Sequence, residues 1–339
     1  MRQSNFELLR IVCMMLVLTV HADFWSLGVP SWAEISATPV PALTRMLVES
    51  AALVCVNVFV MISGWFGIRP SLRGLAAFLF QCLFYSGGIY LAMILLGKAQ
   101  FDLAGVVDNA LLLGRNWFVG SYLVLYLVSP LLNRLIRGAS SVTLAVIVAA
   151  FYLVQTCFGW IADGAIFDGG YSSLSFVGLY LLAALLRRRS SALRPLSWLY
   201  PVSVVANVAL MALIARTGVS LSAEAYSNPL VIMASVGLFS AFARLKIDRS
   251  NFINTLASSA FAVYLIHMNP YIAPSFRAAC IRLYDAVSGP LCLLSFALGL
   301  VVIYAVCVAA DRIRIVVWRL IVSRIGLMPQ QPAANSVDQ

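Results

Sequence analysis

The stretch ELLRIVCMMLVLTVHAD, residues 7–23, is an almost unbroken apolar run that still carries Glu7, Arg10, His21 and Asp23. About 20 apolar residues are needed for a helix to cross the hydrocarbon core of a membrane, and residues 6–25 meet that length. An ionisable group inside such a span is costly, so it normally faces a partner or a water-filled cavity. The stretch therefore predicts a first membrane helix with a functional polar face.

Arg10 and His21 fall on one face of this predicted helix. The eleven steps between them turn the helix about 20° beyond three full turns and place them about 16 Å apart along its axis. Glu7 precedes Arg10 by three residues, which is close enough for an ion pair on the same face. A structural alternative is that Arg10 extends to the cytoplasmic headgroups while His21 caps the outer end of the helix.

The composition of the whole chain is that of a membrane protein. Of its 339 residues, 62% are hydrophobic and only 11% are charged, whereas a soluble domain is about half apolar and about a quarter charged. The net charge of +10 comes from short clusters between apolar segments. This pattern indicates membrane topology and argues against nucleic acid as a partner.

Ten apolar segments predict an all-α, polytopic integral membrane protein with about ten transmembrane helices. They make up a membrane-embedded domain over residues 1–326, and the polar segment 327–339, with two prolines, is predicted to be a disordered tail. The predicted spans are 6–25, 44–66, 75–97, 117–135, 141–160, 174–187, 197–216, 228–245, 254–272 and 289–310.

The distribution of Lys and Arg predicts that both termini are cytoplasmic. All but six of the 23 Lys and Arg residues fall in segments that would share a side with the N-terminus, and the positive-inside rule makes that side cytoplasmic. An alternative for the first segment is a signal peptide cleaved after Ala22, with small residues before the site. Glu7 and Arg10 inside or beside its apolar region argue against that alternative.

Four stretches, in this order along the chain, resemble membrane-bound acyltransferase family 3. The first is SNFELLRIVCMMLVLTVHA (4–22), where Arg10 and His21 match the family's basic residue, ten intervening positions and histidine. The others are NVFVMISGWFGIRPSLR (57–73), NWFVGSYLVLYLVSPLLN (116–133) and FAVYLIHMNPYI (261–272). Glu7 departs from the family, in which many members have aspartate at that position.

The resemblance implies transfer of an acyl group, most simply acetyl, from cytoplasmic acyl-coenzyme A to a hydroxyl of a cell-surface glycan or lipid-linked sugar. It implies a multi-pass protein of the bacterial inner membrane, in contact with membrane lipid and possible polysaccharide-synthesis machinery. His21 suits the role of general base, since a histidine can take a proton from a hydroxyl near neutral pH. A transient acyl-histidine is an alternative.

Arg10, Arg69 and Arg73 are the candidate contacts for the phosphates of coenzyme A, because guanidinium groups bind phosphate in a fork geometry. Ordinary positive-inside charge is the alternative for Arg69 and Arg73. His267, at the depth of His21, is a candidate for acceptor binding or proton relay, with a structural hydrogen bond as the alternative. Glu7 and Asp23 are further candidates for substrate binding. Trp117 is either an interface anchor or a platform for a sugar, and Asp23 could orient His21 only outside a helix.

The remaining polar residues predict a local ion pair and no metal site, and a transporter is the main alternative function. Arg45 and Glu49, at i and i+4, predict a local ion pair. Two histidines and the absence of CxxC spacing predict no metal site. Composition and topology alone are equally compatible with a saccharide exporter or a proton-coupled transporter. The arginine–histidine pattern of the first helix favours the acyltransferase.

Overall fold

The computed structural model describes residues 3–111 and 113–324, and these fold into helices with no strand among them. Short π-helical segments follow α7 and α9, at Val107–Leu111 and Gln155–Ile161. The α-helices are α1 (Ser4–Ala22), α2 (Phe24–Leu27), α3 (Trp32–Ala37), α4 (Pro39–Ala52), α5 (Cys55–Phe66), α6 (Leu72–Leu95), α7 (Leu103–Val106), α8 (Trp117–Gly138), α9 (Ser141–Val154), α10 (Ser173–Arg188), α11 (Leu193–Leu196), α12 (Leu199–Thr217), α13 (Pro229–Ala243), α14 (Asn251–Ala257), α15 (Ala260–His267), α16 (Ala273–Ala286) and α17 (Pro290–Arg324).

The prediction of an all-α polytopic membrane protein is confirmed. Helices occupy each of the ten predicted spans, and in the described part of the chain seven helical segments are long and apolar enough to cross a membrane. The three shorter ones are α10, with 16 residues, α13, with 15, and the pair α14–α15. The predicted disordered tail, 327–339, lies outside the described residues.

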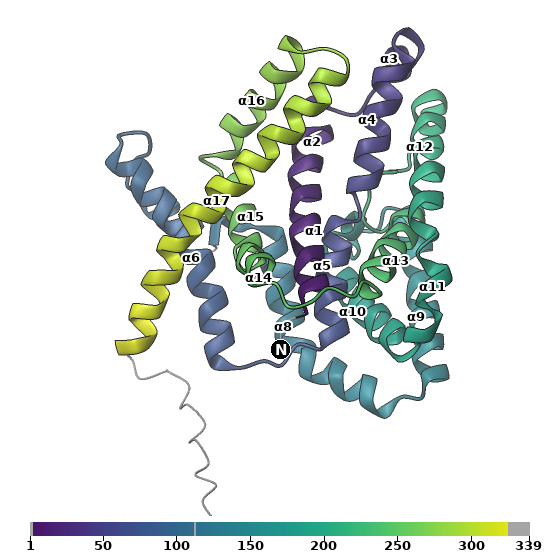
Figure 1. Ribbon diagram of the computed structural model, residues 1–339, viewed down its shortest axis with the longest axis horizontal. Coiled ribbons are helices and arrows are strands. Elements are labelled where there is room, and N and C mark those ends of the chain that lie inside the picture. The colour runs from purple at the N-terminus through teal and green to yellow at the C-terminus, as the bar shows by residue number, and fades with distance from the viewer. Residues whose placement is uncertain (1–2, 112, 325–339) are drawn as a thin grey trace, which may run out of the picture.

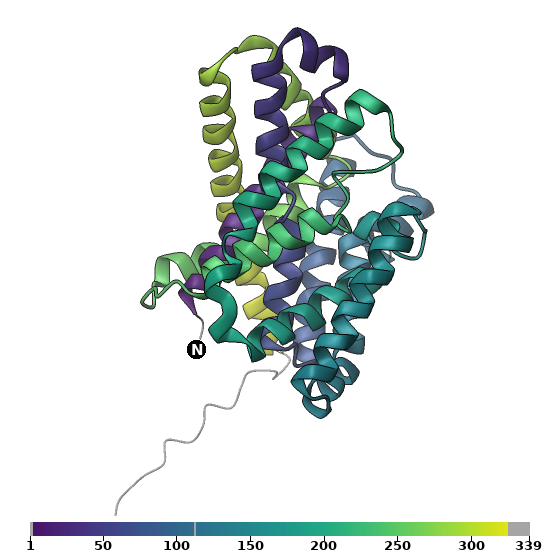
Figure 2. The same cartoon turned by 90° about the vertical axis from the view of Figure 1, so that its right-hand side faces the viewer.

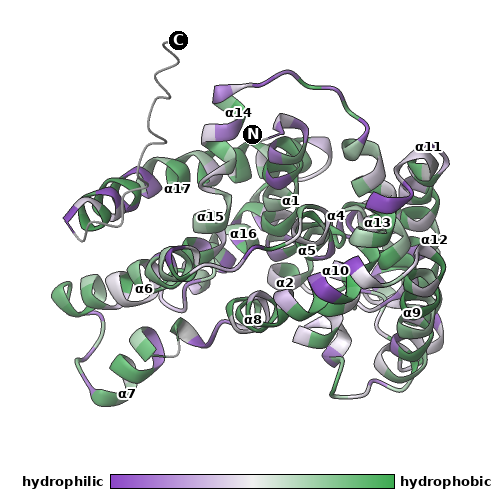
Figure 3. Cartoon of the chain, turned by 90° about the horizontal axis from the view of Figure 1, so that it is seen from below, coloured by the Kyte–Doolittle hydropathy of each residue, from purple (hydrophilic) through white to green (hydrophobic). Residues whose placement is uncertain are grey.

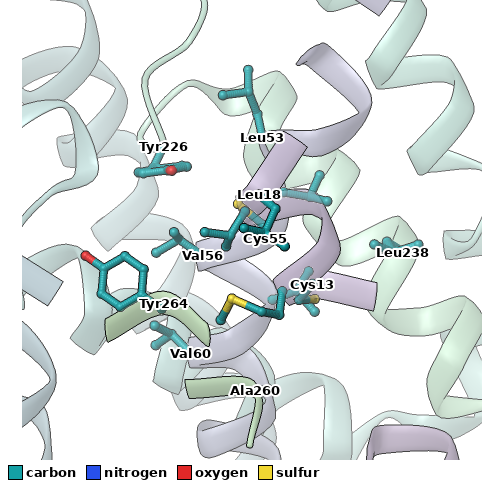
Figure 4. Close-up of a cluster of buried hydrophobic side chains, with 14 of the residues drawn as sticks. Cys13, Leu18, Leu53, Cys55, Val56, Val60, Tyr226, Leu238, Ala260 and Tyr264 are labelled. Atoms are coloured by element: carbon teal, nitrogen blue, oxygen red, sulfur yellow. The ribbon is translucent and has the colours of Figure 1, made fainter. Parts of the chain in front are cut away.

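Helix α1 lies in the middle of the bundle, where it packs against α4, α5 and α13 to α17 (Figure 1). Its side chains Leu9, Cys13 and Leu18 are completely buried. Figure 4 shows Cys13 and Leu18 beside residues of α5, including Val56 and Val60. Helix α1 therefore forms part of the core of the folded bundle.

The outer surfaces of the bundle are apolar. Seen from below, α9 and α12 are hydrophobic along their lengths (Figure 3). The most apolar part of α6 is only 22% buried, whereas that of the central α4–α5 segment is 72% buried. Exposed leucines such as Leu91 and Leu298 face outward from α6 and α17. These outward faces suit contact with lipid tails, which are as apolar as leucine.

Helix α8 runs through Pro130 without a break. Its first turn is capped by Asn116, whose side chain accepts a hydrogen bond from the backbone N–H of Val119. Proline lacks an N–H, so the carbonyl of Tyr126 loses its usual partner four residues on. The hydroxyl of Ser129 donates to this carbonyl at 2.8 Å. The helix therefore continues to Gly138, past the predicted limit of residue 135.

The predicted single span over residues 44–66 is broken in its middle. Helix α4 ends at Ala52 and α5 begins at Cys55, with a turn at Leu53 and Val54 between them. Neither glycine nor proline marks the break in the sequence. Irregular backbone at membrane depth is tolerated where it is buried in protein or lines a cavity, and here Leu53 does line one.

Both ends of the described chain lie at the same end of the bundle. The N-terminus of α1, the end of α17 and the connection between α5 and α6 all lie at the bottom of Figure 1. At the opposite end, α3–α4 and the α16–α17 hairpin project furthest (Figure 2). This arrangement agrees with the prediction that both termini share one side of the membrane.

Candidate active site

A cavity of about 740 Å³ runs beside α1 through the interior of the bundle. Residues of α2, α4, α5, α6, α8, α14 and α15 also line it, together with residues between helices near positions 115, 171 and 224. Helix α1 contributes a stripe at alternating spacings of three and four residues, Glu7, Arg10, Met14, Val17 and His21, together with Val20 beside it. Arg10 and His21 thus face one cavity, as the helical arithmetic predicts.

His21 contacts the chain's second histidine inside the bundle. Nδ1 of His21 lies 2.9 Å from Nε2 of His267, at the C-terminal end of α15. His267 is 2% exposed and lies behind His21, so it does not line the cavity. The predicted equal depth of the two histidines is therefore correct, and His267 is in a position to act through His21.

The hydrogen bonds of His267 determine which nitrogen of each ring carries a proton. Nδ1 of His267 lies 2.6 Å from the carbonyl oxygen of Val263, and a carbonyl only accepts, so this nitrogen is the donor. Nε2 of neutral His267 must then accept the hydrogen bond from Nδ1–H of His21. In neutral His21, this leaves Nε2 with its lone pair available.

The lone pair of His21 Nε2 makes no hydrogen bond to any residue that the structure describes. The ring is held between Tyr264, stacked at 6.4 Å between centroids, and Trp25, edge-on at 5.8 Å. Its side chain lines the cavity. An imidazole with a fixed tautomer and an available nitrogen facing a cavity has the properties of a general base.

At the start of α1, Arg10 and Glu7 form an ion pair. Nη1 of Arg10 donates to Oε1 of Glu7 at 2.9 Å, three residues apart as predicted. The Arg10 side chain is 35% exposed, compared with 6% for Glu7. Guanidinium has five N–H donors in all. Arg10 therefore retains donors that can reach a ligand in the cavity.

Asp23 and Arg45 form a buried ion pair that the sequence did not predict. Nε of Arg45 donates to Oδ1 of Asp23 at 2.7 Å, and Nη2 donates to the carbonyl of Gly28. The predicted local pair of Arg45 with Glu49 is wrong, because α4 faces the bend after α1 and Asp23 takes the guanidinium. Asp23 also does not orient His21, since the partner of the imidazole is His267.

Trp117 is the first residue of α8 and lines the cavity. Its ring centroid lies 4.7 Å from that of Tyr171, and it stacks at 6.3 Å on Tyr226. Both tyrosines also line the cavity. Figure 4 shows Tyr226 and Tyr264 beside the buried cluster around Cys55 and Val56. Trp117 is thus part of an aromatic wall inside the protein and not an anchor at the membrane surface.

Arg69 and Arg73 lie away from the main cavity. Arg69 follows α5 and lines a second pocket of about 480 Å³, to which Arg137, Arg187 and Arg188 also contribute. Arg73 lies exposed in the first turn of α6. Both belong to the end of the bundle where α1 begins (Figure 1). The structure therefore places these arginines on the Arg10 side but not in contact with the α1 stripe.

Glu49 and Glu224 also line the cavity and were not among the predicted site residues. The sequence predicts an ion pair of Glu49 with Arg45, and nothing in the sequence distinguishes Glu224 from the other carboxylates. The absence of a metal site stays a prediction. In residues 3–111 and 113–324, no group of three or more His, Cys, Asp and Glu side chains is arranged to hold a metal ion.

Comparison with known proteins identifies the chain's family. A family model described as "Acyltransferase domain" matches residues 3–312, which is most of the chain. No match was found among curated proteins or among solved structures. The matched range contains the whole cavity and both histidines. The match favours an acyltransferase over a saccharide exporter.

Proposed function

The chain belongs to membrane-bound acyltransferase family 3, and from this premise we propose the reaction it performs. The protein transfers an acyl group, most simply acetyl, from coenzyme A to a hydroxyl of a cell-surface glycan or lipid-linked sugar. The bacterial inner membrane is the proposed location. The observation that carries the proposal is the available Nε2 of His21 in a cavity that Arg10 also lines.

His21 is the proposed general base. Nε2 takes the proton from the acceptor hydroxyl while the hydroxyl oxygen attacks the carbonyl carbon of the thioester. The carbon–sulfur bond then breaks, and the thiolate of coenzyme A takes the proton back from Nε2. His267 accepts the hydrogen bond from Nδ1–H, so it holds the reactive tautomer and the ring orientation throughout.

The donor is proposed to enter from the end of the cavity where Arg10 lies. Arg10 has donors available for a phosphate, and Arg69 and Arg73 add positive charge at the same end. Between Arg10 and His21, helix α1 lines the cavity with the apolar Met14, Val17 and Val20. This segment suits the uncharged arm of coenzyme A, which would bring the thioester to His21.

The residues of the cavity and the outer faces of the bundle also suggest the acceptor site and the partners of the protein. The acceptor hydroxyl is proposed to lie beside Nε2 of His21, in the cavity that Trp117 and Glu49 also line. Lipid surrounds the apolar outer faces, and enzymes of polysaccharide synthesis are proposed partners. Nucleic acid is not a proposed partner, because the basic residues are split among separate connections.

Acyl transfer by the purified protein in lipid nanodiscs tests the proposal. Labelled acetyl-coenzyme A and glycans of the cell envelope are supplied, and label in base-labile O-esters is counted. Wild type and Thr19→Ala, whose side chain bonds its own helix at Met15, should both transfer label. His21→Ala should bind acetyl-coenzyme A and transfer none. Normal turnover by His21→Ala would rule out the proposed base.

A further inference from the structure

Glu49 has a carboxylate oxygen without a partner in the interior of the protein. The residue is 1% exposed, it lines the main cavity, and its Oε2 accepts no hydrogen bond from any residue that the structure describes. The Glu49 carboxylate accepts a hydrogen bond from the backbone N–H of Phe24, three residues after His21. Leaving a buried acceptor unsatisfied is costly, particularly for a charged group.

Arg45 and Arg115 each pair with a carboxylate other than Glu49. Arg45, one helical turn earlier on α4, is bound to Asp23 and to the carbonyl of Gly28. Arg115 lines the cavity, but its guanidinium pairs with Asp108 at 2.7 Å. Glu224 adds a second carboxylate to the same wall. An anionic ligand would bring a further carboxylate next to Glu49 and Glu224, with no cation from the described part of the chain bound to Glu49, and is therefore disfavoured relative to a neutral one.

The same cavity also contains a preformed aromatic surface. Tyr171 and Tyr226 lie 4.9 Å apart between ring centroids, and both contact Trp117. The backbone of Tyr226 is held by Asn57, whose side-chain amide donates to its carbonyl at 3.1 Å. Gly170, at φ +100°, packs so tightly against Tyr226 that a Cβ would come within 2.6 Å of it. These contacts fix the surface before any ligand binds.

A buried carboxylate acceptor beside flat aromatic rings is the chemistry that recognises a sugar ring, with hydroxyls on its edge and C–H groups on its faces. We propose that Glu49 and the surface of Trp117, Tyr171 and Tyr226 form the acceptor subsite, and that it selects a neutral sugar over an acidic one. Oε2 of Glu49 accepts a hydrogen bond from a hydroxyl next to the one that is acylated. The inference rests on the proposed transfer to a hydroxyl.

Acceptors that carry C6 either as a hydroxymethyl group or as a carboxylate test this subsite. Methyl β-D-hexosides of glucose, galactose, mannose and N-acetylglucosamine are compared with methyl β-D-glucuronide and galacturonide in the acetyl-transfer assay. Wild type should use at least one neutral hexoside with kcat/KM about tenfold or more above its uronide. Glu49→Gln keeps the shape of the side chain and should lower kcat/KM for that hexoside by between about ten- and about a hundredfold. The KM for acetyl-coenzyme A should stay unchanged.

The matched control is Glu34→Gln, which removes the same charge from the exposed helix α3 and should leave acceptor selection as in wild type. The inference is overturned if envelope glycans are acylated but uronides are used as well as hexosides. It is equally overturned if no neutral hexoside is used, or if Glu49→Gln behaves as wild type.

If no acyl transfer occurs at all, the proposed function fails, and binding decides the subsite separately. The fluorescence of Trp117 is isolated by subtracting the emission of Trp117→Phe. A hexoside that changes this emission in wild type, and about tenfold more weakly in Glu49→Gln, supports the subsite. No change with any of the hexosides overturns it.

Discussion

The imidazoles of His21 and His267, 246 residues apart in the chain, meet at 2.9 Å, and only His21 faces the cavity. His267 should therefore affect catalysis through the tautomer of His21. Replacement by leucine removes the acceptor for Nδ1–H and should lower kcat by about a hundredfold or more, within the range that a general base contributes. The KM for acetyl-coenzyme A should not change. Steady-state kinetics with labelled donor provides both values.

His267→Gln is the variant that separates positioning from packing. Its side-chain carbonyl can accept the hydrogen bond from His21, so it should retain more of kcat than His267→Leu. Equal losses in the two variants would show that the imidazole of His267 has another role.

Arg10 should contribute to donor binding and not to the chemical step. Arg10→Ala should raise the KM for acetyl-coenzyme A by about tenfold or more, because hydrogen bonds to charged groups are the stronger ones. Acetyl-pantetheine lacks both the diphosphate and the nucleotide of the full donor. Its KM should be the same in Arg10→Ala and wild type. A parallel rise for both donors would place Arg10 away from the phosphates.

Gly64 on α5 should be required for the close approach of α10. A Cβ at this position would lie 2.5 Å from the backbone oxygen of Tyr180, which cannot move without shifting the helix. Gly64→Ala should lower the free energy of unfolding by about 1–3 kcal/mol. The control is Gly120→Ala in α8, where a Cβ meets nothing within 4 Å. It should raise stability by about 0.5–1 kcal/mol. Thermal unfolding in one detergent, followed by circular dichroism, compares the two.

The Asp23–Arg45 pair should stabilise the bend that follows His21. Both side chains are 11% exposed, so Arg45→Met leaves a buried carboxylate without its cation. That loss should cost about 3–5 kcal/mol. Asp23→Leu combined with Arg45→Met should cost less than Arg45→Met alone, since no charge is then stranded. A double-mutant cycle on unfolding measures this coupling, and additive losses would contradict it.

What the sequence predicts correctly here is mainly local. Because α1 is one uninterrupted helix from Ser4 to Ala22, the spacing of Arg10 and His21 in the sequence is enough to place both on one face. The ten predicted spans coincide with helices for a similar reason, because apolar length alone determines where a chain can cross lipid.

What the sequence does not predict depends on tertiary contacts. Arg45 has a carboxylate one turn away on its own helix, yet it pairs with Asp23, which the bend after α1 brings alongside. The turn at Leu53 and Val54 has no glycine or proline to signal it. Glu49 is left without a counterion only because of the Asp23–Arg45 pair. No spacing rule applied to residues 44–66 could have indicated this.

The hydrogen bond from His267 to the carbonyl of Val263 also determines where a proton on His21 can go. An amide carbonyl does not take up a proton, so the chain of hydrogen bonds that begins at His21 ends at Val263. A proton collected by His21 has no onward path through His267 and must leave by the nitrogen that received it. In the proposed transfer, the proton taken from the acceptor hydroxyl therefore leaves with the thiol of coenzyme A and not through His267.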